Sequence, residues 1–196
     1  MAKIKAAING TIQDAITKKA AALFREKGYK ATSMRELAEN IGVEAPSLYN
    51  HIGSKAELLQ NICFKVANDF IFQLQFIEDL KHTTVQKIDQ LIRFHIQMML
   101  QVFDEVFVAN HEWKHLEQPY LDNFLTQRKS YESRMVQLIK DGIKNNELKN
   151  IHPHVAVLTI LSAVRGLEFW QRHKKEISAK VLENNIAAHL LNGLIK

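Results

Sequence analysis

Cysteine, proline and glycine are scarce in this chain, and each shortage excludes a class of structure. The 196 residues contain one cysteine, Cys63, together with three prolines and seven glycines. A single cysteine excludes an intrachain disulfide and is typical of a reducing cytoplasm. Few prolines and glycines leave little punctuation for the many turns of a β-protein, so the composition favours long helices.

Long apolar runs and a strong charge of one sign are also missing. No apolar stretch approaches the length of a membrane span, and residues 1–5 are not followed by the hydrophobic segment of a secretory signal. We therefore expect a cytoplasmic protein with no membrane partner. The net charge is +5, and residues 1–60 hold nine basic and six acidic side chains. This excess permits contact with nucleic acid but does not indicate it by itself.

Hydrophobic periodicity predicts an all-α fold of about nine helices, without strands, repeats or low-complexity segments. The first helix is predicted from about Asn9 to Lys27, where Gly28 ends it. The remaining helices are predicted over about 33–41, 46–51, 54–79, 85–99, 104–116, 119–146, 153–170 and 178–194. The long helix over 54–79 is expected to act as a stiff connector between the N-terminal helices and the rest of the chain.

Two signals for the start of a helix lie close together in residues 33–57. Ser33 with Glu36, and Ser54 with Glu57, both fit the S-x-x-E capping box. In this motif the serine oxygen accepts from a backbone amide, and the glutamate reaches back to the amide of the cap. Helices are therefore predicted to begin directly after Ser33 and Ser54.

Between these two starts the chain has room for a tight turn and one short helix. Gly42 suits the left-handed end of the first helix, and Pro46 suits the first turn of the next. Helix, glycine turn and helix form the pattern of a helix-turn-helix DNA reader, although a plain helical hairpin also fits the spacing. The short helix favours the DNA reader, because its outward positions carry hydroxyl, amide and imidazole groups that suit phosphates and base edges.

These residues resemble the DNA-binding domain of the TetR family of bacterial repressors. The resemblance runs from residues 24–29 through 32–34 to 48–52 and Lys55, and it fades after the first quarter of the chain. Ile52 departs from the phenylalanine more often found there. The resemblance implies a helix-turn-helix domain over 1–53 and an effector-binding and dimerisation domain over 54–196. It also implies a repressor that a small apolar effector releases from a palindromic operator.

Side-chain chemistry and the resemblance together predict which residues contact operator DNA. Tyr49, His51 and Lys55 are expected to contact phosphates, helped by the amide ends of the helices that open at Ser33 and Ser54. Small and polar side chains of the short helix are expected to meet base edges. The predicted set is Ser33, Arg35, Ala45, Pro46, Ser47, Tyr49, Asn50, His51 and Lys55.

The second domain carries a series of residues that runs from Trp113 through Arg128, Tyr131, Gly142 and 146–148 to 169–170. In this series it resembles the subgroup of the family that senses acyl-CoA thioesters. This resemblance implies an apolar cavity, with Arg128, Arg134 and Arg165 as the arginines that could pair with the phosphates of CoA. Salt bridges between helices are an alternative role for the same arginines. The predicted ligand-binding set is Phe103, Trp113, Arg128, Tyr131, Arg165, Phe169 and Trp170.

The last two helices carry more apolar positions than one core-facing stripe needs. Two such helices from each of two subunits would form a symmetric four-helix interface, so we expect a homodimer through 153–170 and 178–194. A terminal hairpin packed on its own core is the alternative.

The strongest rival motif is His111-Glu112-Trp113-Lys114-His115, a literal H-E-x-x-H. On one helix His111 and His115 could ligate zinc, with Glu112 as general base, and the chain would then be a zinc hydrolase. A third ligand at a recognised spacing is missing, as are a phosphate loop and a nucleophile motif. We therefore expect no enzyme, metal or cofactor. A helical interaction module that has lost DNA binding is a further alternative.

Overall fold

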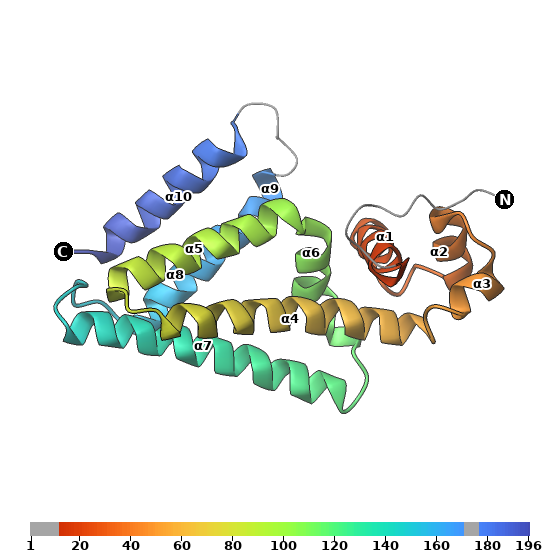
Figure 1. Cartoon of the computed structure of the whole chain (residues 1–196), viewed down its shortest axis with the longest axis horizontal. Coiled ribbons are helices and arrows are strands. Elements are labelled where there is room, and N and C mark those ends of the chain that lie inside the picture. The colour runs from red at the N-terminus through yellow and green to blue at the C-terminus, as the bar shows by residue number, and fades with distance from the viewer. Residues whose placement is uncertain (1–11, 171–176) are drawn as a thin grey trace. The chain divides into compact units, whose positions relative to one another are not determined.

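The computed structural model describes residues 12–170 and 177–196, which are mostly helical. Within these ranges no strand is present, and a single bridge pairs Leu148 with Ile195. The predicted all-α class is therefore confirmed. None of the helices described is both long and apolar enough to cross a bilayer. The elements in Figure 1 are α1 (Ile12–Lys27), α2 (Met34–Ile41), α3 (Ala45–Tyr49), α4 (Lys55–Asp79), α5 (Thr84–Gln101), α6 (Phe103–His111), a 3₁₀ turn η1 (Trp113–His115), α7 (Tyr120–Lys144), α8 (Pro153–Arg165), α9 (Leu167–Trp170) and α10 (Ala179–Leu194).

Most predicted helices form within a few residues of their expected ends, but two segments do not form one helix. The segment 104–116 divides into α6 and η1, and the segment 153–170 divides into α8 and α9. Gly166 ends α8 with its N–H bonded to the Ser162 carbonyl at 3.0 Å. The Phe169 N–H then bonds to the Gly166 carbonyl three residues back, the pattern of a tightened turn. Glycine weakens a helix interior, which explains the break between α8 and α9. The predicted start at Asn9 lies outside the described residues.

The chain divides into two compact units. Unit 1 comprises the residues up to Ala67 together with Asp104–Leu125, and unit 2 comprises Asn68–Phe103 and Thr126–Lys196. The helices α4 and α7 each contribute residues to both units. The boundary predicted between residues 53 and 54 falls at the start of α4, and it stays a prediction.

The core of unit 1 is built on α1, α2 and α3 with the first turns of α4. Leu37 and Leu48 are completely buried, and Ile52 is nearly so. Each such side chain contributes about 1.5–3 kcal/mol relative to an exposed one. Phe24 of α1 and Cys63 of α4 are also completely buried in this unit.

The turns around α2 follow the sequence signals closely. Gly28 and Gly42 adopt positive φ angles of 88° and 85°, a conformation that costs other residues about 1 kcal/mol. At the start of α2, the Ser33 side chain accepts from the Glu36 N–H at 3.1 Å, and the Glu36 carboxylate accepts from the Ser33 N–H at 3.3 Å. The predicted capping box is therefore confirmed.

The second capping motif differs in one bond. Ser54 Oγ accepts from the Glu57 N–H at 3.0 Å, as predicted. The Glu57 carboxylate, however, accepts from the N–H of Gly53 at 2.9 Å instead of returning to Ser54. The motif thus fixes both the first turn of α4 and the residue before its cap.

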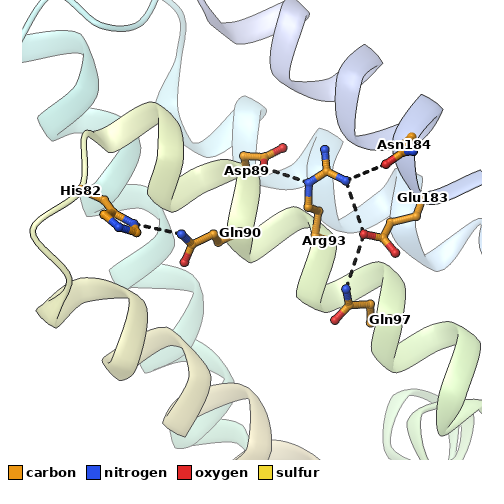
Figure 2. A network of polar contacts seen from close by, with 7 residues as sticks. All are labelled: His82, Asp89, Gln90, Arg93, Gln97, Glu183 and Asn184. Carbon is orange, nitrogen blue, oxygen red and sulfur yellow. Dashed lines mark hydrogen bonds and ion pairs between the residues drawn. The ribbon is translucent and has the colours of Figure 1, made fainter. Parts of the chain in front are cut away.

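Unit 2 is organised around α5, which packs against α8, α9 and α10. A polar network joins α5 to α10, as Figure 2 shows. Arg93 Nη1 lies 3.4 Å from Glu183 Oε1 and 3.0 Å from Asn184 Oδ1, and Arg93 Nε donates to Asp89 at 2.9 Å. Gln97 donates to the same Glu183 oxygen at 3.4 Å.

A close approach ties the end of α7 to the start of α5. A Cβ at Gly142 would lie 2.7 Å from the Leu148 side chain and 2.9 Å from that of Thr84, so a larger residue would force these side chains to move. The Glu147 carboxylate accepts from the Thr84 hydroxyl and from the Val85 N–H, both at 3.1 Å. This junction closes one end of the core of unit 2.

Candidate functional site

One side of α3 is apolar and anchored, and the other is polar and open to solvent. Leu48 is completely buried and holds the helix on the core of unit 1, whereas half of Tyr49 is exposed, at 51%. The predicted base- and phosphate-contacting positions on the open side are Pro46, Tyr49, Asn50 and His51, which are exposed, and Ser47, which is half-buried. The side chain of Ala45 lies outside the part of the chain that the structure describes. This surface offers a phenol, an amide and an imidazole to an external partner.

Ser33 and Arg35 lie at the start of α2. The Ser33 side chain is used in the capping box, and Arg35 is highly exposed, with its Nε 3.0 Å from Glu39 Oε1 one turn later. Lys27 forms an ion pair with Glu36, and this bond raises the pKa of Lys27 and lowers that of Glu36. The end of α1 is thereby linked to the first turn of α2.

Lys55 occupies a different position from the other predicted DNA-contacting residues. Its Nζ donates to the carbonyls of Tyr29 and Thr32 at 3.0 and 2.8 Å, and it lies 4.4 Å from the centre of the Tyr29 ring. The ammonium group is therefore bound to the turn between α1 and α2. In this structure the Lys55 side chain holds that turn against α4.

Tyr29 also links the helix-turn-helix to the part of unit 1 that comes later in the chain. Its ring stacks on His115 of η1, with centroids 5.5 Å apart, and meets Phe24 edge-on at 5.3 Å. Burial lowers the pKa of His115, and it raises the pKa of Tyr29. This contact was not predicted from the sequence, because no local pattern connects residues so far apart in the chain.

The H-E-x-x-H motif does not form the helical pair that a zinc hydrolase needs. The helix α6 ends at His111, and His115 belongs to the separate turn η1. The His111 ring packs on Phe107 at 4.3 Å, while His115 Nε2 lies 3.4 Å from Glu112 Oε2. Within the described residues no three metal-ligating side chains gather in one place. The zinc-hydrolase alternative is therefore not supported.

The predicted ligand-binding residues do not form one cluster. Tyr131 of α7 is inside unit 2, where its hydroxyl lies 2.8 Å from Nε2 of His95. Trp170 is half-buried in the same unit, and its Nε1 is fully covered. By contrast, Arg165 is exposed and Phe169 is 70% exposed. The others are half-buried: Phe103 and Arg128 in unit 2, and Trp113 in unit 1.

The buried His95 of unit 2 was not identified from the sequence. His95 is buried on α5, and its ring also packs on Phe70 at 4.6 Å. Arg134, one of the three arginines considered for the CoA phosphates, forms a two-pronged ion pair with Glu78 of α4, which is the salt bridge between helices given as its alternative role. A small apolar cavity lies between α5, α7 and α8, lined by Ile88, Leu91, Ile92, Met135, Leu138, Ile139, Val157 and Ile160.

Two known protein families match this chain, one in its N-terminal part and one in its C-terminal part. A family described as "Bacterial regulatory proteins, tetR family" matches residues 16–62, and "Tetracyclin repressor-like, C-terminal domain" matches residues 81–194. The HTH-type transcriptional repressor KstR2 of Mycolicibacterium smegmatis is 22% identical over 187 residues, covering 93% of this chain and 90% of the relative. The IcaR negative regulator of the biofilm operon icaADBC of Staphylococcus epidermidis is 28% identical over 100 residues, half of each protein.

Solved structures share the fold over nearly the whole chain. The ketosteroid regulator KstR2 of Mycobacterium tuberculosis superposes with a TM-score of 0.88 at 20% identity, covering 97% of both chains. AibR in complex with isovaleryl coenzyme A and operator DNA has a TM-score of 0.77 at 22% identity, covering 92% of this chain and 96% of that one. The two family matches together span the helix-turn-helix and more than half of the chain. The chain therefore belongs to the TetR family of bacterial regulatory proteins and is a DNA-binding transcriptional regulator.

Proposed function

We propose that this regulator is a homodimeric repressor that binds a palindromic operator through α3 and leaves it when an apolar effector binds in unit 2. The observation that carries the proposal is the open polar side of α3, held on the core by Leu48. A helix-turn-helix inserts its second helix into the major groove, and two-fold symmetry of the dimer then selects a two-fold symmetric site. Operator binding would place the protein in the cytoplasm with the chromosome.

Each exposed group near α3 has a suitable partner on DNA. The Asn50 amide can pair with the N6 and N7 edge of adenine, and Pro46 can contact a thymine methyl group. Tyr49 and His51 can donate to phosphate oxygens, and the exposed guanidinium of Arg35 adds a cation nearby. Base contacts would set the sequence preference, whereas phosphate contacts would set the register.

The dimer is proposed to form through α8 and α10. Val155 and Leu158 of α8 are 56% and 65% exposed, and Val181 of α10 is 51% exposed. These helices also pack on each other and on α5, so their remaining apolar surface faces away from the core of unit 2. A second copy of the same pair would cover that surface in an isologous interface.

An acyl-CoA thioester is the proposed class of effector. Support comes from the apolar cavity between α5, α7 and α8 and from the fold shared with AibR, whose structure contains isovaleryl coenzyme A. The arginines proposed for the CoA phosphates are Arg128 and Arg165. Arg134, also considered for them, forms an ion pair with Glu78. By thermodynamic linkage, bound DNA must lower the affinity for the effector by the same factor by which the effector lowers the affinity for DNA.

The test of DNA binding uses fluorescence anisotropy with the DNA upstream of the protein's own gene. We expect salt-dependent, sequence-selective binding, and Asn50→Ala should weaken it by roughly 1–3 kcal/mol at sites with the matching base. The control is Lys65→Ala, an exposed α4 residue away from the proposed contacts, which should bind like the native protein. Equal affinity for unrelated DNA, or an unaltered affinity in the Asn50 variant, would contradict the proposal.

A second titration tests the effector class. Acyl-CoA thioesters of increasing chain length are added to the protein–DNA complex, with free CoA as the control. Release by the thioesters and not by CoA alone is the expected result, because the acyl chain supplies the apolar contact. Release by free CoA alone, or by none of these compounds, would exclude this class of effector and leave the operator proposal standing.

A further inference from the structure

Polar side chains interrupt an otherwise apolar stripe in the core of unit 2. His95 of α5 is 7% exposed, and its Nε2 lies 2.8 Å from the Tyr131 hydroxyl of α7. The ring of Phe70 from α4 packs against both, at 4.6 Å from His95 and 5.8 Å from Tyr131. Three helices thus enclose one hydrogen-bonded pair.

The pair is neutral near pH 7. Burial lowers the pKa of His95 to about 4 and raises the pKa of Tyr131. Whichever group donates in their mutual bond, the phenol oxygen keeps a lone pair for another partner. The charged groups that act on Tyr131 are Arg134 and Glu78, which form an ion pair and so offset one another.

Two further polar atoms in unit 2 are buried without a partner. Among the residues described, Gln127 Oε1 and Trp170 Nε1 are covered and have no hydrogen bond. Gln127 precedes Tyr131 by one turn of α7, so the two side chains lie on the same face. Trp170 belongs to α9, which packs against α5. Each unpaired atom costs about 1–3 kcal/mol, a cost that a bound polar group would remove.

The pair lies one helical turn from the apolar cavity. Leu91 and Ile92 line that cavity and precede His95 on α5, while Met135 lines it and follows Tyr131 on α7. The apolar stripe of both helices therefore continues directly into the polar pair. The cavity is small, so a ligand would enter it by moving these helices apart.

We propose that His95, Tyr131, Gln127 and Trp170 form the polar end of the apolar part of the effector site and recognise a neutral oxygen group within the apolar part of the ligand. The inference rests on the proposed effector-binding function and narrows it. A carbonyl or hydroxyl group can satisfy neutral donors and acceptors of this kind. A carboxylate would be desolvated there without a cation of its own, at a much greater cost.

The test measures binding of three probes of equal chain length to the full protein by calorimetry at pH 7: 2-decanone, 2-decanol and decanoate. The two neutral probes should bind at least about tenfold more tightly than decanoate, because the carboxylate loses its hydration in a site that offers no cation of its own. Tyr131→Phe and Gln127→Leu should each weaken 2-decanol about fivefold. Gln137→Leu, an exposed α7 residue, is the matched control and should bind all three like the native protein.

Fluorescence gives an independent readout. The chain has two tryptophans, so in a Trp113→Phe background the emission reports Trp170 alone. The neutral probes should shift that emission, and Tyr131→Phe should reduce the probe affinity measured this way by the same factor.

Three outcomes overturn the inference: decanoate binds as well as the neutral probes, the Tyr131 and Gln127 variants change only the melting temperature, or no probe binds. If operator binding is intact in such an experiment, the proposed DNA-binding function is unaffected. If the protein instead fails to bind operator DNA, the proposed repressor function is overturned, whatever the probes do.

Discussion

At the scale of single residues, Lys55 has two possible roles that can be told apart: stabilising the turn between α1 and α2, or contacting DNA. Its Nζ satisfies the carbonyls of Tyr29 and Thr32, so Lys55→Met would leave two acceptors unpaired. We expect the free energy of unfolding to fall by about 1–3 kcal/mol, measured by urea denaturation.

The salt dependence of DNA binding supplies the opposing result for Lys55. Loss of one phosphate contact lowers the slope of log affinity against log salt by about one. If Lys55→Met keeps its native stability and loses one unit of that slope, the lysine contacts phosphate and its carbonyl bonds matter little. Lys65→Ala should change neither quantity.

His95 makes the stability of unit 2 depend on pH. Burial lowers its pKa to about 4 from an ordinary value of 6.5. The pKa of His95 is lower in the folded protein than in the unfolded chain. The free energy of unfolding is therefore fully retained above pH 6.5 and decreases as the pH falls toward 4, because the unfolded chain then binds a proton that the folded protein does not. Between pH 7 and pH 5 the native protein should lose about 2 kcal/mol more than His95→Gln, measured by urea unfolding at each pH. Identical losses in both proteins would show that His95 can be protonated in the folded state.

At the scale of elements, the network of Figure 2 holds α10 on α5. The Glu183 side chain is only 12% exposed and accepts from both Arg93 and Gln97. We expect Glu183→Gln to lower the free energy of unfolding by about 1–2 kcal/mol in urea denaturation. The control is Glu39→Gln, which removes the more exposed Arg35–Glu39 pair and should cost less than about 0.5 kcal/mol. Equal effects of the two variants would show that the network adds nothing to an ordinary surface pair.

Local sequence signals predicted most helix ends well. They failed where the same signal is compatible with more than one structure. Ser33 with Glu36 and the left-handed Gly42 fixed the ends of α2, because all their partners lie within a few residues. The break at Gly166 was missed, since a glycine inside an apolar periodic segment can either continue or end a helix. The S-x-x-E motif also did not predict that the Glu57 carboxylate accepts from the N–H of Gly53 instead of that of Ser54.

The candidate site was predictable to a similar extent. The exposure of Tyr49, Asn50 and His51 followed from the position of Leu48 on a short helix. The carbonyl bonds of Lys55 and the stacking of Tyr29 on His115 join residues that are distant in the chain, and no pattern in a single sequence encodes such pairs.

At the scale of the whole molecule, the proposed dimer rests on the uncovered apolar residues of α8 and α10. Leu158→Glu would place a charge in the centre of that interface, so we expect a monomer by analytical ultracentrifugation. Operator affinity should fall by at least about tenfold, because the second half-site no longer binds in the same event.

Phe72→Glu on α4 provides the matched control for this prediction. Phe72 is 72% exposed and lies outside α8 and α10, so this variant should remain dimeric. A dimeric Leu158→Glu protein, or a monomer formed by Phe72→Glu, would move the interface to another surface.

The burial of Cys63 gives this regulator a built-in reporter. It is the single thiol of the chain and is completely covered within α4. A thiol reagent can therefore modify it only during transient openings of unit 1, and the labelling rate counts those openings without an introduced tag. Operator DNA bound to the same unit would slow the labelling of Cys63. The labelling rate with and without DNA therefore reports how far operator binding suppresses the openings of unit 1.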